Sequence, residues 1–347
     1  MRIAVASTHE TGVATPLASL WFAAPACREL GIELEFIWTQ KATGLPTLRA
    51  ADRVIFDGAN VLRHYLGPFY YAAARALRKP TALYSHETAW NLRAATSLVP
   101  TFMGPLPIPL ALRHALVSRK CVHFHVCEPG IELLVERYGV GRERTHRLAN
   151  ITDASSFLAR ELPCPTTVGL NLIVGKVSER KGADLLFDIA ERVVQRDPRR
   201  RFRWLGGFGG GPFAREACLA MAAERGLADH IEFLGFRRDV ADHMAQAELV
   251  LSVSRDDPMP KVLMEALALG KHCVAFDVGG IPDLLGEHGT VIPRYDRDAF
   301  AEAVLRGTPD DSLAAQEARR AYFRERFSEA AFAHRFQDAV RWWSSLL

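Results

Sequence analysis

The sequence lacks the features that mark several classes of protein. No run of 18 or more apolar residues occurs, so no segment has the composition of a membrane-spanning helix. The net charge is only +3, which argues against a nucleic-acid partner. The first residues form a short apolar strand pattern and not the long apolar region of a secretion signal. We therefore expect a cytoplasmic protein.

Cysteine is scarce and its spacing is uninformative. The six cysteines form no Cys-x-x-Cys pair and no spacing typical of a zinc ribbon. His123 and His125 lie between Cys121 and Cys127, which resembles a metal-binding cluster. The alternation of these histidines with apolar residues instead predicts a strand with both histidines on one face. We therefore expect reduced thiols and no metal site.

The composition is that of an ordinary globular chain, with 49% hydrophobic and 24% charged residues. A length of 347 residues predicts two domains. Residues 1–165 carry 18 basic against 13 acidic side chains, and the remaining residues carry 25 against 27. A basic first half and a near-neutral second half suggest two domains with different partners.

Short apolar runs alternate with helical patterns along the whole chain. The predicted strands are Ile3–Ala6, Leu34–Ile37, Arg53–Phe56, Thr81–Tyr84, His123–Val126, Leu170–Val174, Phe202–Leu205, Ile231–Leu234, Leu249–Val253 and His272–Ala275. The predicted helices are Leu17–Leu30, Pro68–Leu77, Ile131–Tyr138, Asp184–Gln195, Phe213–Arg225, Pro260–Leu269 and Arg297–Leu305. This order predicts an α/β protein with two successive doubly wound, Rossmann-like units.

Two prolines in Leu162–Pro165 interrupt this alternation and indicate a linker. We expect a first domain over residues 1–163 and a second over 164–327. Residues 328–347 form an amphipathic pattern with Trp342 and Trp343, which predicts a helix that returns to the first domain. Ligands of doubly wound sheets bind beyond the carboxyl ends of the strands, so the expected site is a cleft between the two domains.

The first candidate site segment is Ser254–Gly270. Pro260 fits the first turn of a helix, and the backbone amides of Lys261 and Val262 at its start favour an anion. Asp257 and Glu265 flank these amides. Two carboxylates around an amide cluster suit a diphosphate that lies between two polyhydroxyl groups. The alternative is a structural helix with an acidic residue near its start and one partly exposed glutamate.

The second candidate segment is Leu172–Gly182, which leaves a buried strand through Gly175. It places Lys176 and Lys181 ahead of a helix, and lysine is a compact charge suited to phosphate. The alternative is a pair of solvated basic residues. The glycines of Gly206–Gly211 do not fit the Gly-x-Gly-x-x-Gly pattern, which argues against a nicotinamide-dependent oxidoreductase. We interpret that segment as a flexible loop bordering the expected cleft.

Four motifs occur in the second half in a characteristic order. They are Gly175-Lys176-x4-Lys181-Gly182, Ile231–Phe236, the pair Asp257 and Glu265 eight residues apart, and Asp277-Val278-Gly279-Gly280-Ile281-Pro282-Asp283. In this order they resemble the Gly-Arg-x4-Lys-Gly, nucleobase-strand, Glu-x7-Glu and Asp-x-Gly-Gly-x-Pro-Glu motifs of the family 4 retaining glycosyltransferases. The resemblance covers most of residues 147–305.

The resemblance implies the GT-B fold and transfer of a hexosyl group from a UDP- or GDP-sugar, with retention of configuration and without metal or other cofactor. The acceptor would be a glycan or lipid-linked glycan of cell-surface polysaccharide or glycoconjugate synthesis. Glu265 would hold the ribose hydroxyls and Asp257 the donor-sugar hydroxyls, while Lys176 and Lys181 would neutralise the departing diphosphate. The other implied donor contacts are Gly12, Gly175, Phe236, Arg237, Met259, Lys261 and Val262.

Two residues depart from the family pattern. Asp257 stands in place of glutamate and shortens the reach of the carboxylate by one methylene, and Lys176 stands in place of arginine and loses its bidentate fork. These changes keep a second reading open, a non-catalytic GT-B relative that binds a nucleotide sugar or a glycan.

The first half matches the family less well. Only Gly12 remains of the glycines expected after the first strand, and His86 stands where the family has a histidine near the reacting sugar. A structural histidine at a strand end is the alternative for His86. Residues 98–110 are apolar and proline-rich with basic residues after them, which suits an anionic membrane surface and a lipid-linked acceptor, or else a loop buried against the first domain. The basic residues are Arg113, His114, Arg119 and Lys120.

Overall fold

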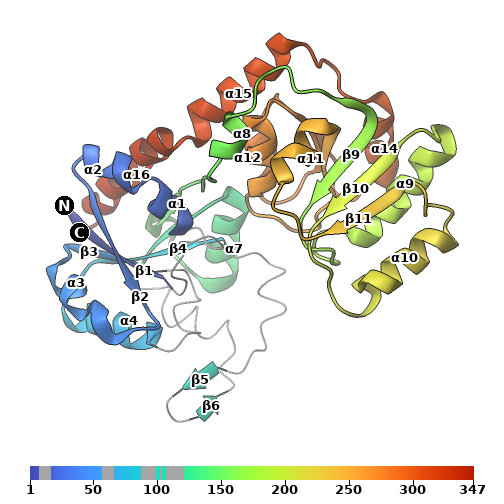
Figure 1. Ribbon diagram of the computed structural model, residues 1–347. Coiled ribbons are helices and arrows are strands. Elements are labelled where there is room, and N and C mark those ends of the chain that lie inside the picture. The colour runs from blue at the N-terminus through green and yellow to red at the C-terminus, as the bar shows by residue number, and fades with distance from the viewer. Residues whose placement is uncertain (8–16, 57–65, 87–98, 102–103, 107–120) are drawn as a thin grey trace. The chain divides into compact units, whose positions relative to one another are not determined.

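The computed structural model describes the chain except for residues 8–16, 57–65, 87–98, 102–103 and 107–120 (Figure 1). The described part forms two compact units. The first comprises Met1–Thr152 together with Phe327–Leu347, and the second comprises Asp153–Arg326. Each unit contains a six-stranded parallel sheet with helices beside it, which confirms the predicted pair of doubly wound α/β units.

The first sheet has the strand order β2-β1-β3-β4-β7-β8. Its strands are β1 (Arg2–Ser7), β2 (Glu33–Trp38), β3 (Arg53–Phe56), β4 (Thr81–Ser85), β7 (Val122–His125) and β8 (Thr145–Arg147). The helices of this part are α1 (Leu17–Phe22), α2 (Ala24–Glu29), α3 (Leu45–Ala50), α4 (Gly67–Ala76) and α7 (Glu128–Tyr138), with short 3-10 turns at Ala42–Gly44 and Arg142–Arg144. A separate antiparallel pair joins β5 (Val99–Thr101) and β6 (Gly104–Leu106).

The strands predicted in the first half are all present, each within one residue of its expected ends. The helix expected over Leu17–Leu30 is instead two helices that meet at Ala23. Pro25 lies in the first turn of α2 and has no amide hydrogen to donate to the preceding turn, so a continuous helix cannot form there.

The last helix, α16 (Glu329–Ser345), belongs to the first unit, as expected. It begins after Ser328, whose hydroxyl accepts a hydrogen bond from the Ala331 amide at 3.2 Å. Its buried face packs against α2 and brings Trp343 to 5.9 Å from Phe124 of β7, measured between ring centroids. Arg53 stacks over the Trp343 ring at 4.8 Å. Apolar burial of this face holds the end of the chain on the first sheet.

The second sheet has the order β11-β10-β9-β12-β13-β14. Its strands are β9 (Thr167–Val174), β10 (Arg201–Leu205), β11 (Ile231–Gly235), β12 (Ala247–Ser252), β13 (His272–Phe276) and β14 (Thr290–Ile292). The helices are α8 (Ser155–Leu158), α9 (Ala183–Arg196), α10 (Arg215–Glu224), α11 (Val240–Gln246), α12 (Lys261–Ala268), α13 (Ile281–Leu285), α14 (Arg297–Arg306) and α15 (Leu313–Phe327), with a 3-10 turn at Gly211–Phe213. The strand order reverses between β9 and β12, which is where doubly wound sheets bind ligands.

The contacts divide the chain at Thr152, before the boundary expected at residue 163. Residues 153–163 belong to the second unit, where the Arg160 carbonyl accepts a hydrogen bond from Arg320 at 2.9 Å. The Arg160 side chain also forms an ion pair with Asp242 at 2.5 Å. The proline-containing segment therefore lies within the second unit and does not mark its beginning.

The fold shows where the histidines and cysteines considered as possible metal ligands lie. His123 and His125 lie on β7 with both side chains buried, and all six cysteines are buried free thiols. Among the described residues, no group of three or more His, Cys, Asp or Glu side chains is arranged to hold a metal ion. Within the same residues, no helix has both the length and the apolar character needed to cross a bilayer.

Candidate functional site

Two loops meet at the point where the second sheet reverses its strand order. The first follows β9 and runs from Gly175 to Gly182, and the second follows β12 and leads to Pro260. Across them, the Lys181 ammonium Nζ lies 2.5 Å from Oδ2 of Asp257. The Asp257 side chain is only 8% exposed and that of Lys181 20%. The fold thus joins two residues that the sequence placed in separate candidate segments.

The close approach of the two loops depends on Gly182. This residue precedes α9 with a left-handed φ of +74°, and a Cβ atom built on it would lie 1.8 Å from the Val253 carbonyl oxygen. Only glycine fits such a contact, because any other residue would collide with the backbone of the second loop. The amide of Arg255 then donates to the Arg180 carbonyl at 2.9 Å, so the loops are joined through their backbones.

The turn Asp277–Asp283 supports the second loop from the other side. Gly279 has a φ of +56°, and a Cβ atom there would lie 2.0 Å from the carbonyl oxygen of Asp257. The amide of Gly280 donates to the Pro258 carbonyl at 2.8 Å. The Gly-Gly pair of this motif therefore lets the turn pack directly under the residue that carries the candidate sugar-binding carboxylate.

Helix α12 begins beside the ion pair. Its first-turn amides, from Lys261 onward, lie at the positive end of the helix dipole and suit an anion. Glu265 lies one turn further along and is half-buried. Burial lowers the pKa of the Lys261 ammonium, and the negative charge of Glu265 acts in the opposite direction. Along the chain, Asp257, the first amides of α12 and Glu265 thus follow one another within this segment.

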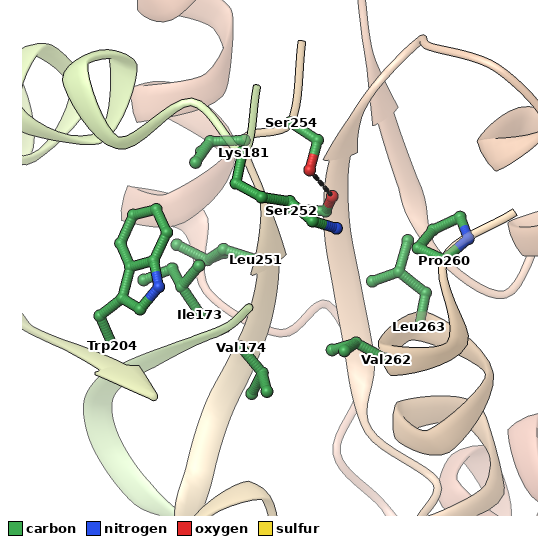
Figure 2. A pocket seen from close by; sticks show the side chains of 11 residues that line it. Ile173, Val174, Lys181, Trp204, Leu251, Ser252, Ser254, Pro260, Val262 and Leu263 are labelled. Atoms are coloured by element: carbon green, nitrogen blue, oxygen red, sulfur yellow. Dashed lines mark hydrogen bonds between the residues drawn. The ribbon is translucent and has the colours of Figure 1, made fainter. Parts of the chain in front are cut away.

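A small pocket lies between the carboxyl ends of β9 and β12. Figure 2 shows the Lys181 side chain extending past Ser252 toward the start of α12, where Pro260 and Val262 lie. Most of the side chains that line the pocket are apolar, and Lys181 is the charged side chain among them. Its lining residues are Ile173, Val174, Lys181, Trp204, Leu251, Ser252, Val253, Ser254, Pro260, Val262 and Leu263.

A larger groove of about 400 Å³ lies beside it, beyond the ends of β9, β10 and β11. It brings together the predicted donor residues Gly175, Lys176, Phe236 and Arg237. The ring of Phe236 is 78% exposed at the rim. An exposed aromatic ring at the rim of an apolar groove suits stacking of a planar ligand. The remaining lining residues are Val174, Leu205, Gly206, Gly207, Phe208 and Val240, so part of the glycine-rich segment lines this groove.

Other predicted site residues lie elsewhere or outside the described residues. His86 directly follows β4 in the first unit and is half-buried, whereas the donor residues belong to the second unit. Gly12 is outside the described residues, as are Arg113, His114, Arg119 and Lys120. The described parts of the apolar segment 98–110 form the β5–β6 pair. Met259 is buried in the loop between Asp257 and α12.

Three residues that the sequence analysis did not single out hold the second loop. Arg180 donates to the Asp256 carbonyl at 2.8 Å, and Arg255 forms a two-pronged ion pair with Asp184 at 2.5 Å. The Tyr295 hydroxyl donates to the Arg255 carbonyl at 2.9 Å. Arg180 is adjacent to Lys181 in the sequence, which is a weak signal. No sequence pattern links Tyr295 to a loop that lies 40 residues earlier.

The match to a protein family lies within the second unit. Residues 170–308 match the family described as Glycosyl transferases group 1. The alpha-D-kanosaminyltransferase of Streptomyces kanamyceticus is 27% identical over 275 residues, which cover 74% of this chain and 69% of the relative. A D-inositol 3-phosphate glycosyltransferase of Corynebacterium glutamicum is 31% identical over 54% of this chain, but the match spans only 43% of that relative.

A solved structure shares the fold along the whole chain. Anabaena Alr3699/HepE in complex with UDP-glucose superposes with a TM-score of 0.69 and 17% identity, covering 98% of this chain and 99% of that chain. At this identity the likeness concerns the fold alone. The family match, the curated relatives and the two-sheet architecture together support a family 4-like glycosyltransferase with the GT-B fold.

Proposed function

We propose that the protein transfers a hexosyl group from a nucleoside diphosphate sugar to a glycan or lipid-linked glycan acceptor, with retention of configuration and without a metal. The Lys181–Asp257 pair beside the start of α12 is the observation that carries the proposal. It places a cation, backbone amides and a carboxylate at the switch point of the second sheet, where such a ligand binds. The relative crystallised with UDP-glucose supports a uridine nucleotide, and a guanosine nucleotide is the alternative.

Each part of the donor has a matching part of the site. The base would lie in the groove against Phe236, with backbone contacts from Arg237, and Glu265 would accept hydrogen bonds from the ribose hydroxyls. The diphosphate would lie against the first amides of α12 and the ammonium of Lys181. The sugar would then reach Asp257, whose carboxylate accepts hydrogen bonds from hydroxyls.

The reaction would break the bond between the anomeric carbon and the diphosphate oxygen. The acceptor hydroxyl oxygen forms the new bond on the same face, and its proton passes to the departing phosphate oxygen. Negative charge grows on that leaving group, so Lys181, Lys176 and the α12 amides stabilise the transition state more than the ground state. These fixed positive groups supply the charge compensation for the departing diphosphate, and no protein nucleophile is required.

The acceptor would bind the first unit. Its basic excess, with 17 basic against 11 acidic side chains in residues 1–152, suits an acidic acceptor or the inner face of an anionic membrane. His86, at the carboxyl end of β4, is the residue of this unit that we assign to the acceptor or to the reacting sugar.

A direct test uses the purified full chain with UDP-glucose, UDP-galactose and GDP-mannose. Thermal shift identifies the nucleotide, because a ligand that binds only the folded state raises its stability. Release of UDP or GDP then reports turnover, and NMR of the product reports its anomeric configuration. Glu265→Ala and Lys181→Ala should both abolish turnover, whereas Asp229→Asn, an exposed residue before β11, should not change it.

The outcomes separate the two readings of the site. Full activity in both site variants would show that the assigned site is wrong. Binding of a nucleotide sugar without hydrolysis or transfer, even with a panel of glycan acceptors, would favour the non-catalytic relative. Asp257 and Lys176, which replace the glutamate and arginine of the family pattern, favour this second reading.

A further inference from the structure

The loop that presents Asp257 is held by side chains attached to its backbone. The Arg255 carbonyl accepts a hydrogen bond from the Tyr295 hydroxyl at 2.9 Å, and the Asp256 carbonyl accepts one from Arg180 at 2.8 Å. These two carbonyls belong to the residues immediately before Asp257. The orientation of the peptide groups that lead into Asp257 is therefore fixed by Tyr295 and Arg180.

Tyr295 is held in a conformation that tyrosine rarely adopts. Its φ is 64°, which lies in the left-handed region of the backbone map. Glycine enters this region without steric penalty, whereas the Cβ atom of an aromatic residue makes it unfavourable. The residue lies between β14 and the first turn of α14, where Asp296 accepts a hydrogen bond from the Ala299 amide at 2.9 Å. Strained residues of this kind persist where the surroundings over-determine them, and they gather at functional sites.

The side chain of Tyr295 points at the site loop and not into a core of its own. Its ring makes an edge contact with Phe276 at 6.0 Å between centroids, and the residue remains 40% exposed. Its specific polar contact is with the Arg255 carbonyl, at 2.9 Å. The strained backbone and the ring contact together aim one hydroxyl at the loop that carries Asp257.

We propose that Tyr295 is a positioning residue for donor-sugar recognition, acting through Arg255 on Asp257. The inference rests on the proposed function, because it assigns the sugar hydroxyls to Asp257. The Asp257 carboxylate has one methylene fewer than glutamate, so a small rotation of the preceding peptide moves it out of hydrogen-bond range of the sugar. Tyr295 therefore determines how strongly the sugar part of the donor is bound.

The groups that hold the nucleotide part of the donor lie outside this contact, and Tyr295→Phe keeps the charge of Asp257 beside Lys181. The groove at Phe236 and the amides of α12 belong to other segments of the unit. Arg255 also keeps its ion pair with Asp184 when the Tyr295 hydroxyl is absent, so the loop stays docked to the first loop. Loss of the hydroxyl should loosen Asp257 and leave the diphosphate site in place.

The test is Tyr295→Phe, which keeps the ring and the backbone strain and removes only the hydroxyl. Calorimetry on the full chain measures the affinities of UDP and UDP-glucose, or of GDP and GDP-mannose where wild type prefers guanosine. We expect the affinity for the nucleotide sugar to fall about tenfold, the size of one lost hydrogen bond, and that for the free nucleotide to stay within about twofold. Tyr322→Phe, the other tyrosine hydroxyl of the second unit, is the matched control and should change neither.

Two further variants distinguish positioning from a general structural role. Tyr295→Gly removes the hydroxyl and also relieves the left-handed strain, so it should lose sugar affinity as Tyr295→Phe does while unfolding at no lower temperature. In an Asp257→Asn background, Tyr295→Phe should have no additional effect, because its influence passes through the carboxylate.

Unchanged affinity for the nucleotide sugar in Tyr295→Phe would overturn the inference. An equal loss for nucleotide and nucleotide sugar would overturn it as well, because that is the result of a structural role. If wild type neither binds nor turns over any nucleotide sugar, the proposed function fails and the inference fails with it. That result is seen before any variant is made, so the two failures are distinct.

Discussion

The ammonium of Lys181 lies 2.5 Å from the carboxylate of Asp257, and both side chains are mostly buried. In the free protein the cation assigned to the diphosphate is thus neutralised by the carboxylate assigned to the sugar. An incoming diphosphate must share or displace this partner. The two residues therefore cannot act independently, and the charge of Asp257 opposes binding of the nucleotide.

This coupling predicts that Asp257→Asn binds free UDP or GDP more tightly than wild type. Removing the carboxylate leaves the Lys181 charge available to the phosphates, and we expect a gain of about three- to tenfold in affinity. Transfer should fall at least about a hundredfold, because the sugar loses its charged hydrogen-bond acceptor. Calorimetry and nucleotide release measure the two effects. Asp229→Asn makes the same charge change on the exposed surface, and equal gains in both variants would mean a long-range charge effect only.

Lys181→Ala should destabilise the protein as well as inactivate it. The Asp257 carboxylate, 8% exposed, would be left without its cation, at a cost of roughly 1–3 kcal/mol of unfolding free energy. Urea unfolding measures this loss. The double variant Lys181→Ala with Asp257→Asn should recover most of the stability and none of the activity. Stability that stays low in the double variant would contradict the ion pair as its source.

Phe236→Ala should weaken nucleotide binding without affecting folding. The ring is 78% exposed, so its loss removes little buried surface. Stacking of a base on an aromatic ring contributes about 1–3 kcal/mol, which corresponds to roughly a five- to hundredfold loss of affinity. Val168→Ala, on another exposed apolar residue of the same unit, should leave affinity unchanged. Equal binding by Phe236→Ala and wild type would place the base elsewhere.

Gly279→Ala should disturb both stability and activity. Its Cβ would lie 2.0 Å from the Asp257 carbonyl oxygen in a left-handed backbone, so the site loop must move. Gly226→Ala is the matched control, because Gly226 has a φ of +69° and open space around its Cβ position. The control should cost about 1 kcal/mol and keep full activity, since only the backbone penalty applies. If both variants behave alike, the packing of the turn under Asp257 has no role in catalysis.

Stability should decline in mild acid because of His272. Burial lowers the pKa of its imidazole from 6.5 to about 4, so the folded state favours the neutral ring. The unfolded chain takes up a proton below pH 6.5, and stability is therefore lost as the pH falls from about 6.5 to about 4 and then levels off. The loss should amount to roughly 3 kcal/mol. Urea unfolding across this range should show the slope in wild type and a flatter line in His272→Gln.

The fold was predictable where burial makes the pattern simple. Strands buried on both faces are short apolar runs, so β1 and β3 were located almost to the residue. β8 and β14 span three residues each, too few to show a pattern, and were missed. The break between α1 and α2 follows from Pro25, which the apolar periodicity of that segment concealed.

The site was predictable as a list of residues and not as an arrangement. Lys181 and Asp257 were each assigned to a ligand, but their contact exists only because β9 and β12 are neighbours in the sheet. Strand order cannot be read from either segment alone. Tyr295 carries no motif, and its left-handed backbone is invisible in the sequence because tyrosine does not indicate that conformation.

Both ends of the chain belong to the first unit, and the second unit is one continuous segment between them. On the ribosome, Met1–Thr152 emerges first but cannot complete the packing around Phe124 until Trp343 and the rest of α16 have been synthesised. The sheet of the second unit is formed by strands of that unit alone, so it needs no residue that is translated after the unit. The half of the protein that is translated first is therefore the half that finishes folding last.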